Sequence, residues 1–568
     1  MQQSKTLTLW INNDFDQYWK DADDNAYYDD SVTVAQGGNI PDCNYHYAGA
    51  RVIPTQRDLE DFARLWLCGV TSNLLSALPP GSTVTLDWGD VGNPNPANPT
   101  IDLFPVFEDD GGMGYLTDPS AAMLQSASSI CPYIGRLGPG QRIQLTGSQF
   151  TNGWAGEHFI WCGVSNGTGA LTLTISQGGT NTLAQTAAYV QIVDVKQIYE
   201  RWTIGDNPSK AGYTNAVPAV EDLPLGVTGF QYPNPTDTNT PYILYVHGWN
   251  MDRYDKDRFA ESAFKRLYWQ GYQGRFGVFR WPTDYGFKGT LWKAATQPHN
   301  YDSSEFTAWR SATGLLNKLN DLNTEYPGHV YVLAHSMGNV VAGEAMQLAA
   351  EQGMGQLVNT YVGSQGAIPA HVYDETVASP YLIDYTHSAH SLPAPGQQRT
   401  PNIYGNRLTN TVSAAGRRIN FYNANDYALS ADAWCFDQEL KPDTFVESGR
   451  YYYNGNTDDP PPWNNFQFLF SGGGPAGILD IVNSAQQRYE VLAYAANPYS
   501  TALGATPGVG GLTENLDLTT VWPSDTTGHG YADHLWHSAQ FRGDIWQQWS
   551  YWSTLSHSSR FGFGLPTP

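Results

Sequence analysis

The chain has 568 residues and a formal net charge of −24, with 54 acidic side chains against 30 basic ones. Such a charge repels phosphate backbones and anionic lipid surfaces, and no clustered stripe of Lys and Arg overrides it, so nucleic acid is excluded as an expected partner. Charged residues make up only 15% of the sequence, while Gly (57) and Pro (35) are plentiful. This composition favours a compact, turn-rich protein, and a length of roughly 150 residues per domain suggests about two to four domains.

The first part of the chain, residues 1–204, holds short alternating runs separated by turn residues. These runs are TLTLWI, STVTLDW, TIDLFPVF, QRIQLTG, HFIWCGV, GALTLTIS and YVQIVDV. Their spacing is typical of a β-sandwich, so we expect an all-β, sandwich-like accessory domain here. One segment, RDLEDFARLWL at Arg57–Leu67, is predicted to form a helix.

An acidic run near the start, NNDFDQYWKDADDN, offers hard oxygen ligands of the kind that Ca²⁺ prefers. The candidate ligands are Asp14, Asp16, Asp21 and Asp23. The run lacks the glycine that an EF-hand loop has at its sixth position, so a solvated acidic loop is the alternative. A structural Ca²⁺ is therefore an open candidate, and no other cofactor is expected.

The five cysteines are widely spaced and include no C-x-x-C pair, which argues against a zinc site and a disulfide-dense scaffold. One or two disulfides in the first domain are conceivable if the protein is exported. No apolar run reaches the length of about 18 residues that spans a bilayer. The N-terminus lacks the features of a signal peptide. Localisation stays open; we favour an extracellular or periplasmic location, with any leader absent from this chain.

Residues 205–240 are rich in Pro, Asn, Thr and Gly with little periodicity, and we interpret them as a linker. From residue 241 to 568 buried-strand patterns alternate with amphipathic-helix patterns. This alternation predicts a mostly parallel sheet with helices on both faces. Two long irregular stretches, about 371–417 and 430–535, interrupt it. Loops of that length usually carry function, and the first is a lid candidate.

The stretch VYVLAHSMGNVV predicts a buried strand, a tight turn at Ser336 and the start of a helix. Ala334 and Gly338 supply the small residues two positions to either side that a nucleophile elbow requires. The alternative is a serine that merely caps the helix. A second motif, YVHGWN, ends another predicted strand about 90 residues upstream. It contains His247 and Gly248, and it predicts an oxyanion hole formed by the backbone amides of Trp249 and Met337.

A serine nucleophile needs a base to take its proton, and the base needs an acid to orient it. Asp426 follows the alternating run RINFYNAND and is the candidate acid, with a turn-forming role as the alternative. The base should be a histidine further along the chain. We favour His537, just ahead of a predicted terminal helix, with His529 as the alternative base. His335 points the wrong way for a base and is expected to pack beneath the elbow.

The run from HGWN through RWPTDYG to AHSMGNVVAGEAM resembles a group of bacterial α/β-hydrolases of mostly unassigned substrate. The shared features are an HGxN strand end, a W-P-S/T turn and AHSMGN, and the resemblance covers about residues 242–349. It implies an α/β-hydrolase fold with Ser336 as nucleophile and the HG loop as oxyanion donor. Asp426 and His537 rest on chain order rather than on a motif.

Taken together, these motifs predict a serine hydrolase that cleaves carboxylic esters, esterase-like or lipase-like, without a metal in the chemistry. The substrate is expected to be a small-molecule or polymeric ester; thioester or amide substrates would use the same residues. The alternative is a surface binding or adhesion protein with an inactive hydrolase-like domain. The oligomeric state is not predicted.

Overall fold

The chain divides into two compact units, seen in a computed structural model. The first unit comprises Met1–Ile198, Leu225–Phe230 and Arg542–Trp549, and the second comprises Tyr199–Pro224, Gln231–Phe541 and Ser550–Pro568. The structure describes residues 6–11, 18–20, 26–28, 52–53, 57–106, 112–126, 134–146, 149, 156–204, 221–223, 239–249, 251, 253–283, 308, 311–368, 370–374, 408, 411, 413–424, 426, 429, 502–522, 537–542 and 545–567.

The first unit is rich in β-structure, as the alternating runs predict. A five-stranded sheet has the order β1 (Leu7–Ile11), β13 (Asn181–Asp194), β12 (Gly167–Gln177), β7 (Ser82–Asp87) and β10 (Arg142–Leu145). A four-stranded sheet has the order β6 (Ala63–Cys68), β11 (Gly156–Ser165), β8 (Thr100–Pro105) and β9 (Gly135–Leu137). All neighbouring strands are antiparallel except β1 and β13. The β-rich character is confirmed, and the sandwich arrangement stays a prediction.

The smaller elements of the first unit are short helices and two-stranded ribbons. The helices are α1 (Ser72–Ala77), α2 (Gly114–Thr117) and α3 (Pro119–Ser126), with 3-10 turns at Leu59–Asp61 and Val195–Gln197. The ribbons pair β2 (Tyr18–Lys20) with β3 (Ala26–Tyr28) and β4 (Val52–Ile53) with β5 (Arg57–Asp58).

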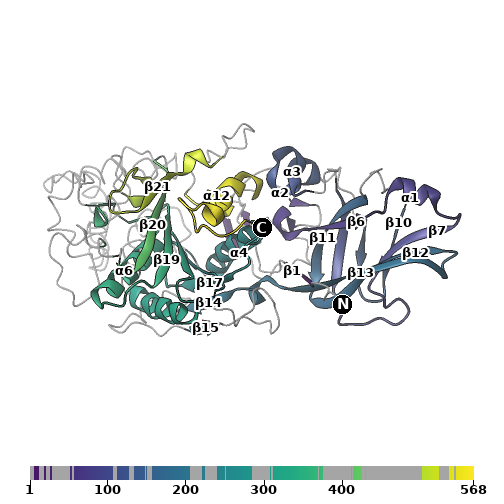
Figure 1. Ribbon diagram of the computed structural model, residues 1–568, viewed down its shortest axis with the longest axis horizontal. Coiled ribbons are helices and arrows are strands. Elements are labelled where there is room, and N and C mark those ends of the chain that lie inside the picture. Colours follow the sequence, from purple (N-terminus) through teal and green to yellow (C-terminus); the bar gives the residue numbers. More distant parts are fainter. Residues whose placement is uncertain are drawn as a thin grey trace, which may run out of the picture. The chain divides into compact units, whose positions relative to one another are not determined.

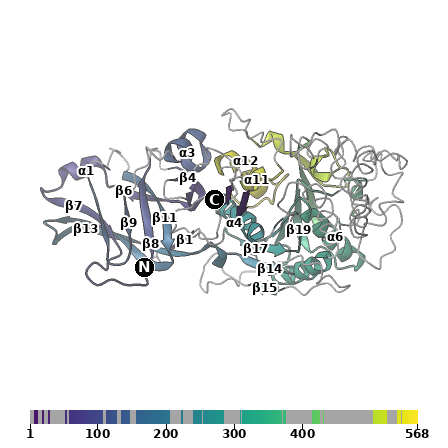
Figure 2. The same ribbon diagram turned by 180° about the vertical axis from the view of Figure 1, so that it is seen from behind.

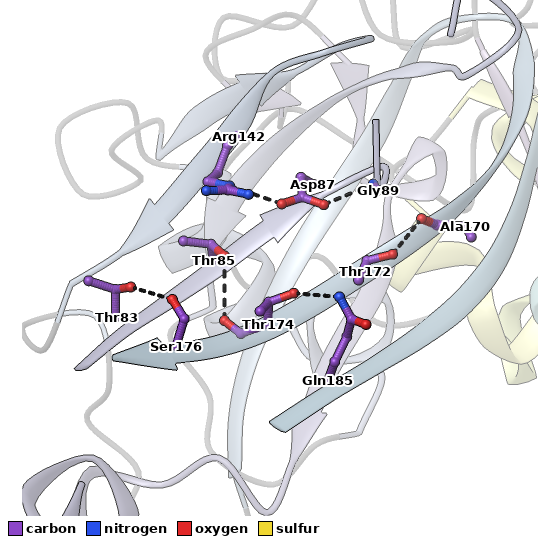
Figure 3. A network of polar contacts seen from close by, with 10 residues as sticks. All are labelled: Thr83, Thr85, Asp87, Gly89, Arg142, Ala170, Thr172, Thr174, Ser176 and Gln185. Carbon is purple, nitrogen blue, oxygen red and sulfur yellow. Dashed lines mark hydrogen bonds and ion pairs between the residues drawn. The ribbon is translucent and has the colours of Figure 1, made fainter. Parts of the chain in front are cut away.

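Polar side chains link the strands of the five-stranded sheet to one another (Figure 3). Arg142 of β10 donates to Asp87 of β7 at 3.0 Å, and Gln185 of β13 donates to Thr174 of β12 at 3.1 Å. Cross-strand pairs of this kind each contribute roughly 0.2–1 kcal/mol and help to fix the register of a sheet. The two sheets approach each other at Gly163, where an added Cβ would lie 2.6 Å from the Ile11 side chain.

The helix predicted at Arg57–Leu67 is wrong. These residues form β5, the 3-10 turn and the start of β6, which pairs antiparallel with β11. One face of β6 is more buried than the other. Ala63 and Leu67 are buried, whereas Trp66 and Cys68 are exposed. Pairing with a long neighbouring strand overrides the local helical pattern.

The second unit is built on an eight-stranded sheet in which seven strands are parallel, as the alternating strand and helix patterns predict. Its order is β15 (Glu221–Leu223), β14 (Glu200–Thr203), β17 (Arg275–Arg280), β16 (Tyr242–Val246), β18 (Val330–His335), β19 (Val358–Ser364), β20 (Ala415–Tyr422) and β21 (Glu514–Asp517). Only β15 runs antiparallel to its neighbour. β14 and β15 lie within residues 1–240, so this sheet begins ahead of the predicted domain limit at 241.

Helices cover both faces of this sheet; Figures 1 and 2 show β19 between α6 on one side and α4 and α12 on the other. The helices are α4 (Arg253–Trp269), residues 311–325, α6 (Gly338–Glu351), α11 (Ala539–Arg542) and α12 (Ile545–His557), with 3-10 turns at Ala370–Val372, Leu503–Ala505 and Leu518–Thr520. The end of α11 and the first five residues of α12 are assigned to the first unit. Alternate residues of β16 face opposite sides of the sheet. Leu244 belongs to the core under α6, whereas the ring centroid of Tyr245 lies 5.3 Å from that of Phe541.

The predictions on membrane-spanning segments and on disulfides can be compared with the described residues. No helix among the described residues is long and apolar enough to cross a membrane. Cys68 carries a free thiol, and Cys162 is buried in β11. Cys43, Cys131 and Cys435 lie outside the described residues, so disulfides involving them stay untested.

Candidate active site

The segment around Ser336 forms the sharp strand-to-helix turn that its sequence predicts. β18 is buried along its whole length, and α6 begins at Gly338 with Met337 as its N-cap. Ser336 itself has a φ of 52°. A positive φ costs a non-glycine residue about 1–3 kcal/mol and persists only where the surroundings hold it. Here the Ser336 amide donates to Ser364 O at 3.1 Å, and the Ser336 carbonyl accepts from Ala367 N at 3.0 Å.

Close backbone approach explains the glycines on both sides of this turn. A Cβ on Gly338 would lie 2.5 Å from Val246 O and 2.6 Å from His247 O. A Cβ on Gly248 would lie 2.8 Å from Ser336 Cβ. The end of β16 therefore lies directly against the turn after β18, and a larger residue at either position would force the neighbouring backbone to shift.

Asn339, the last letter of AHSMGN, holds the turn from inside α6. Its Nδ2 donates to Ala334 O at 3.2 Å and to Ser336 O at 2.9 Å. Its Oδ1 accepts from the hydroxyl of Tyr361 on β19 at 2.5 Å. Asn339 and its three partners Ala334, Ser336 and Tyr361 are buried. Polar groups that lack a hydrogen bond in the interior cost free energy. Asn339 thus ties the strained turn to the neighbouring strand.

The HG loop after β16 is fixed by the segment after β17 that contains Trp281 and Thr283. The Trp281 amide donates to His247 Nε2 at 3.1 Å, its indole donates to His247 O at 2.8 Å, and the two rings stack at 5.3 Å. Thr283 Oγ1 bonds both the amide and the carbonyl of Met251. Burial, with a contribution from Lys256, holds the pKa of His247 well below its usual value. His247 is therefore a neutral structural residue at neutral pH.

Asp426 and His537, predicted as acid and base from chain order, are in direct contact. His537 Nδ1 donates to Asp426 Oδ2 at 2.8 Å, because a carboxylate only accepts. The Asp426 side chain is fully buried and the His537 side chain is 12% exposed. With its proton on Nδ1, the imidazole leaves Nε2 free to accept a proton.

His537 also lies beside the elbow, through His335. The ring centroids of these two histidines are 5.0 Å apart, and His335 Nε2 lies 2.8 Å from His537 O. Within the described part of the chain, no hydrogen bond joins the Ser336 hydroxyl to His537. Such bonds are often long in unliganded enzymes and shorten only when substrate binds. Ser336 remains 6% exposed.

Gln365, directly after β19, contacts the candidate acid Asp426 and was not predicted from the sequence. Its Nε2 donates to Asp426 Oδ2 at 2.6 Å, so one carboxylate oxygen accepts from both Gln365 and His537. Gln365 has a φ of 47°, and among the described residues it shares a positive φ with only one other non-glycine, Ser336. A strained residue at a site is a marker of function, but no sequence motif signals it.

The predicted oxyanion donors are the backbone amides of Met337 and Trp249. Met337 is the N-cap of α6, and the first amides of a helix have no acceptor within that helix. Trp249 follows Gly248 and is partly buried against the sheet core. The helix dipole adds a partial positive charge near Ser336.

Other predicted features lie wholly or largely outside the described residues. These are the alternative base His529 and the calcium candidates Asp14, Asp16, Asp21 and Asp23. Of the lid candidate, residues 371–374, 408, 411 and 413–417 are described, and of the stretch 430–535, residues 502–522. Within the described ranges, no group of three or more His, Cys, Asp or Glu side chains is arranged to hold a metal ion.

Comparison with known proteins supports an α/β-hydrolase region. A family model described as an alpha/beta hydrolase of unknown function (DUF900) matches residues 234–380, about a quarter of the chain, which include the HG loop and the elbow. No curated protein matches the chain.

Similar solved structures are hydrolases at low identity. A prodiginine-pathway thioesterase from Streptomyces coelicolor is 12% identical, with a TM-score of 0.18, covering 48% of this chain and 70% of its own. A metagenomic carboxyl esterase is 14% identical, with a TM-score of 0.20 and coverages of 58% and 79%. Lipase B from Aspergillus fumigatus is 10% identical, with a TM-score of 0.19 and coverages of 50% and 66%. Over residues 234–380, this chain is similar to an α/β-hydrolase family.

Proposed function

We propose that this protein is a serine hydrolase that cleaves carboxylic esters through an acyl-enzyme on Ser336. Ser336 Oγ attacks the ester carbonyl carbon while His537 Nε2 takes its proton, and Asp426 orients the imidazole. The tetrahedral intermediate collapses, and the proton on His537 passes to the departing alcohol. Water then gives a proton to His537 and attacks the acyl carbon, releasing the acid and restoring the Ser336 hydroxyl.

The observation that carries the proposal is the buried bond between His537 and Asp426 beside a strained serine. A carboxylate at Nδ1 fixes the tautomer that leaves Nε2 as a base. A structural reading of Ser336 as a helix cap explains neither its positive φ nor the histidine and aspartate pair from later in the chain.

The proposed oxyanion hole consists of the amides of Trp249 and Met337. Its support is the close approach of Gly248 to Ser336, together with the Trp281 contacts that hold the HG loop. Two preorganised amides would stabilise the charge that develops on the carbonyl oxygen, and the loss of one such donor typically costs about 10²–10³-fold in kcat.

The test combines a fluorophosphonate probe with a series of p-nitrophenyl esters of increasing acyl length. Ser336→Ala should abolish both labelling and hydrolysis, with thermal unfolding nearly unchanged. The matched control is Ser76→Ala, an exposed serine in α1, which should behave as wild type. Full hydrolysis by Ser336→Ala would refute the proposal.

The same assay distinguishes the two candidate bases. If His537 is the base, His537→Gln should lose both activities, whereas His529→Gln should keep them. The reverse result would assign the base to His529 and leave Ser336 as the nucleophile. The acyl-length series reports whether short, long-chain or aryl esters are preferred.

A further inference from the structure

The imidazole of His335 lies between the elbow and the loop that carries His537. His335 is the last residue of β18, directly before Ser336, and only 1% of it is exposed. Its ring contacts Phe541 at 5.1 Å, His537 at 5.0 Å and Phe259 at 6.3 Å between centroids. The ring therefore sits in a largely aromatic pocket.

One ring nitrogen of His335 makes a defined hydrogen bond. Nε2 lies 2.8 Å from the backbone carbonyl of His537, and a carbonyl can only accept, so Nε2 carries the proton. Burial, and then the neighbouring His537, lowers the pKa of His335 to about 3. The ring is consequently neutral at physiological pH, and Nδ1 is unprotonated.

The surroundings of the other ring nitrogen, Nδ1, indicate that the Nε2 bond is the reason for a histidine at this position. His335 Nδ1 is buried and has no hydrogen-bond partner among the described residues. A buried polar atom without a partner is costly, and a phenylalanine would fill an aromatic pocket without that cost. Packing alone therefore does not explain a histidine at this position, whereas the bond that Nε2 donates does.

We propose that His335 is a positioning residue that holds the main chain of His537 in place for proton transfer. Two anchors then fix His537: the bond from its Nδ1 to Asp426 and the bond from its carbonyl to His335. With both ends held, Nε2 keeps one orientation toward the edge where Ser336 lies. This inference rests on the proposed function of Ser336 and His537.

The test compares two substitutions that fill the same pocket. His335→Phe keeps a ring but removes the donor, while His335→Gln places an amide NH₂ near the position of Nε2. Because small misplacements of a reacting group can cost about 10²-fold, we expect kcat to fall about 10- to 100-fold in His335→Phe with little change in KM. His335→Gln should recover much of that loss.

A matched control substitutes a histidine elsewhere in the second unit. His557 also contacts backbone carbonyls, those of Gln270 and Leu565, and takes no part in the proposed chemistry. His557→Phe should leave kcat unchanged. A second measurement, independent of activity, is hydrogen exchange of the amides in residues 537–542, which should speed up in His335→Phe and much less in His335→Gln.

Each outcome decides the proposal. Wild-type kcat in His335→Phe would overturn it, and so would equal losses in both variants with equally lowered melting temperatures, because that result indicates packing alone. If the wild-type protein neither hydrolyses esters nor reacts with the probe, the proposed function fails by itself. In that case, unchanged hydrogen exchange of residues 537–542 in His335→Phe overturns the proposal that His335 holds the main chain of His537. Faster hydrogen exchange supports it.

Discussion

Gly248 is the residue at which the HG loop and the elbow come closest. A Cβ at this position would lie 2.8 Å from Ser336 Cβ and 3.2 Å from His335 Nδ1. Neither neighbour can easily move: Ser336 is held in a strained conformation and His335 is buried. Any side chain at 248 must therefore displace the loop that carries the amide of Trp249.

We accordingly expect Gly248→Ala to lower kcat about 10²-fold, because it moves one proposed oxyanion donor away from the carbonyl oxygen. KM and the melting temperature should change far less. The measurement is steady-state hydrolysis of the best ester from the acyl series. Gly135→Ala is the control, since its Cβ would meet only Ile143 at an ordinary 3.4 Å. Wild-type kcat in Gly248→Ala would remove Trp249 from the oxyanion hole.

The site could be predicted from sequence as far as motifs and chain order reach. Ser336 stands in a strand-turn-helix motif, and the contact between Asp426 and His537 agrees with the chain order expected of the proposed acid and base. Gln365 gave no such signal. Its role arises from a main-chain turn that places an ordinary side chain against Asp426, and no residue type demands that turn.

At the scale of elements, strands with a continuous buried apolar run were predictable from the sequence, and short or context-dependent strands were not. The buried runs of β16 and β18 are recognisable as strands from their apolar composition. β14 and β15 are only four and three residues long, too short to show periodicity. They pair with each other ahead of residue 241, and β14 also pairs with β17 beyond it. Arg57–Leu67 has apolar residues at helical spacing, but β11 provides a partner that makes the strand more favourable.

Gly163 lies where the two sheets of the first unit approach each other, beside Ile11 and Ile192. A Cβ there would lie 2.6 Å from Ile11 Cγ2, 2.7 Å from Ile192 Cγ2 and 3.1 Å from Trp10 O. Overpacking a buried contact typically costs about 1–3 kcal/mol, so Gly163→Val should destabilise the first unit by that amount. Calorimetric unfolding measures it, with the exposed Thr168→Val of β12 as control. An unchanged transition would contradict close packing of β11 against β1 and β13.

At the scale of the whole molecule, buried neutral histidines make stability depend on pH. The pKa of His335 is about 3 in the folded protein, whereas an exposed histidine has a pKa near 6.5. Between these values the unfolded chain binds a proton that the folded chain does not, so stability falls as pH drops from about 6.5 toward 3. One such imidazole costs about 2 kcal/mol of stability at pH 5.

We therefore expect His335→Phe to gain about 2 kcal/mol of unfolding free energy relative to wild type when the pH is lowered from 7.5 to 5. Urea unfolding at the two pH values measures this difference. His335→Gln should show the same relative gain, because glutamine does not titrate either. An identical pH dependence in wild type and both variants would mean that the imidazole is not buried in neutral form.

The parallel sheet gathers at one edge side chains that are far apart in the chain: Ser336, Asp426 and His537. During synthesis, a growing polypeptide displays the serine about 200 residues before the imidazole has been made. Under the proposed mechanism, any product that stops short of residue 537 carries an alcohol without a proton acceptor. Reactivity thus arises only after residue 537 has been made, so translation products that end before this residue would not hydrolyse esters.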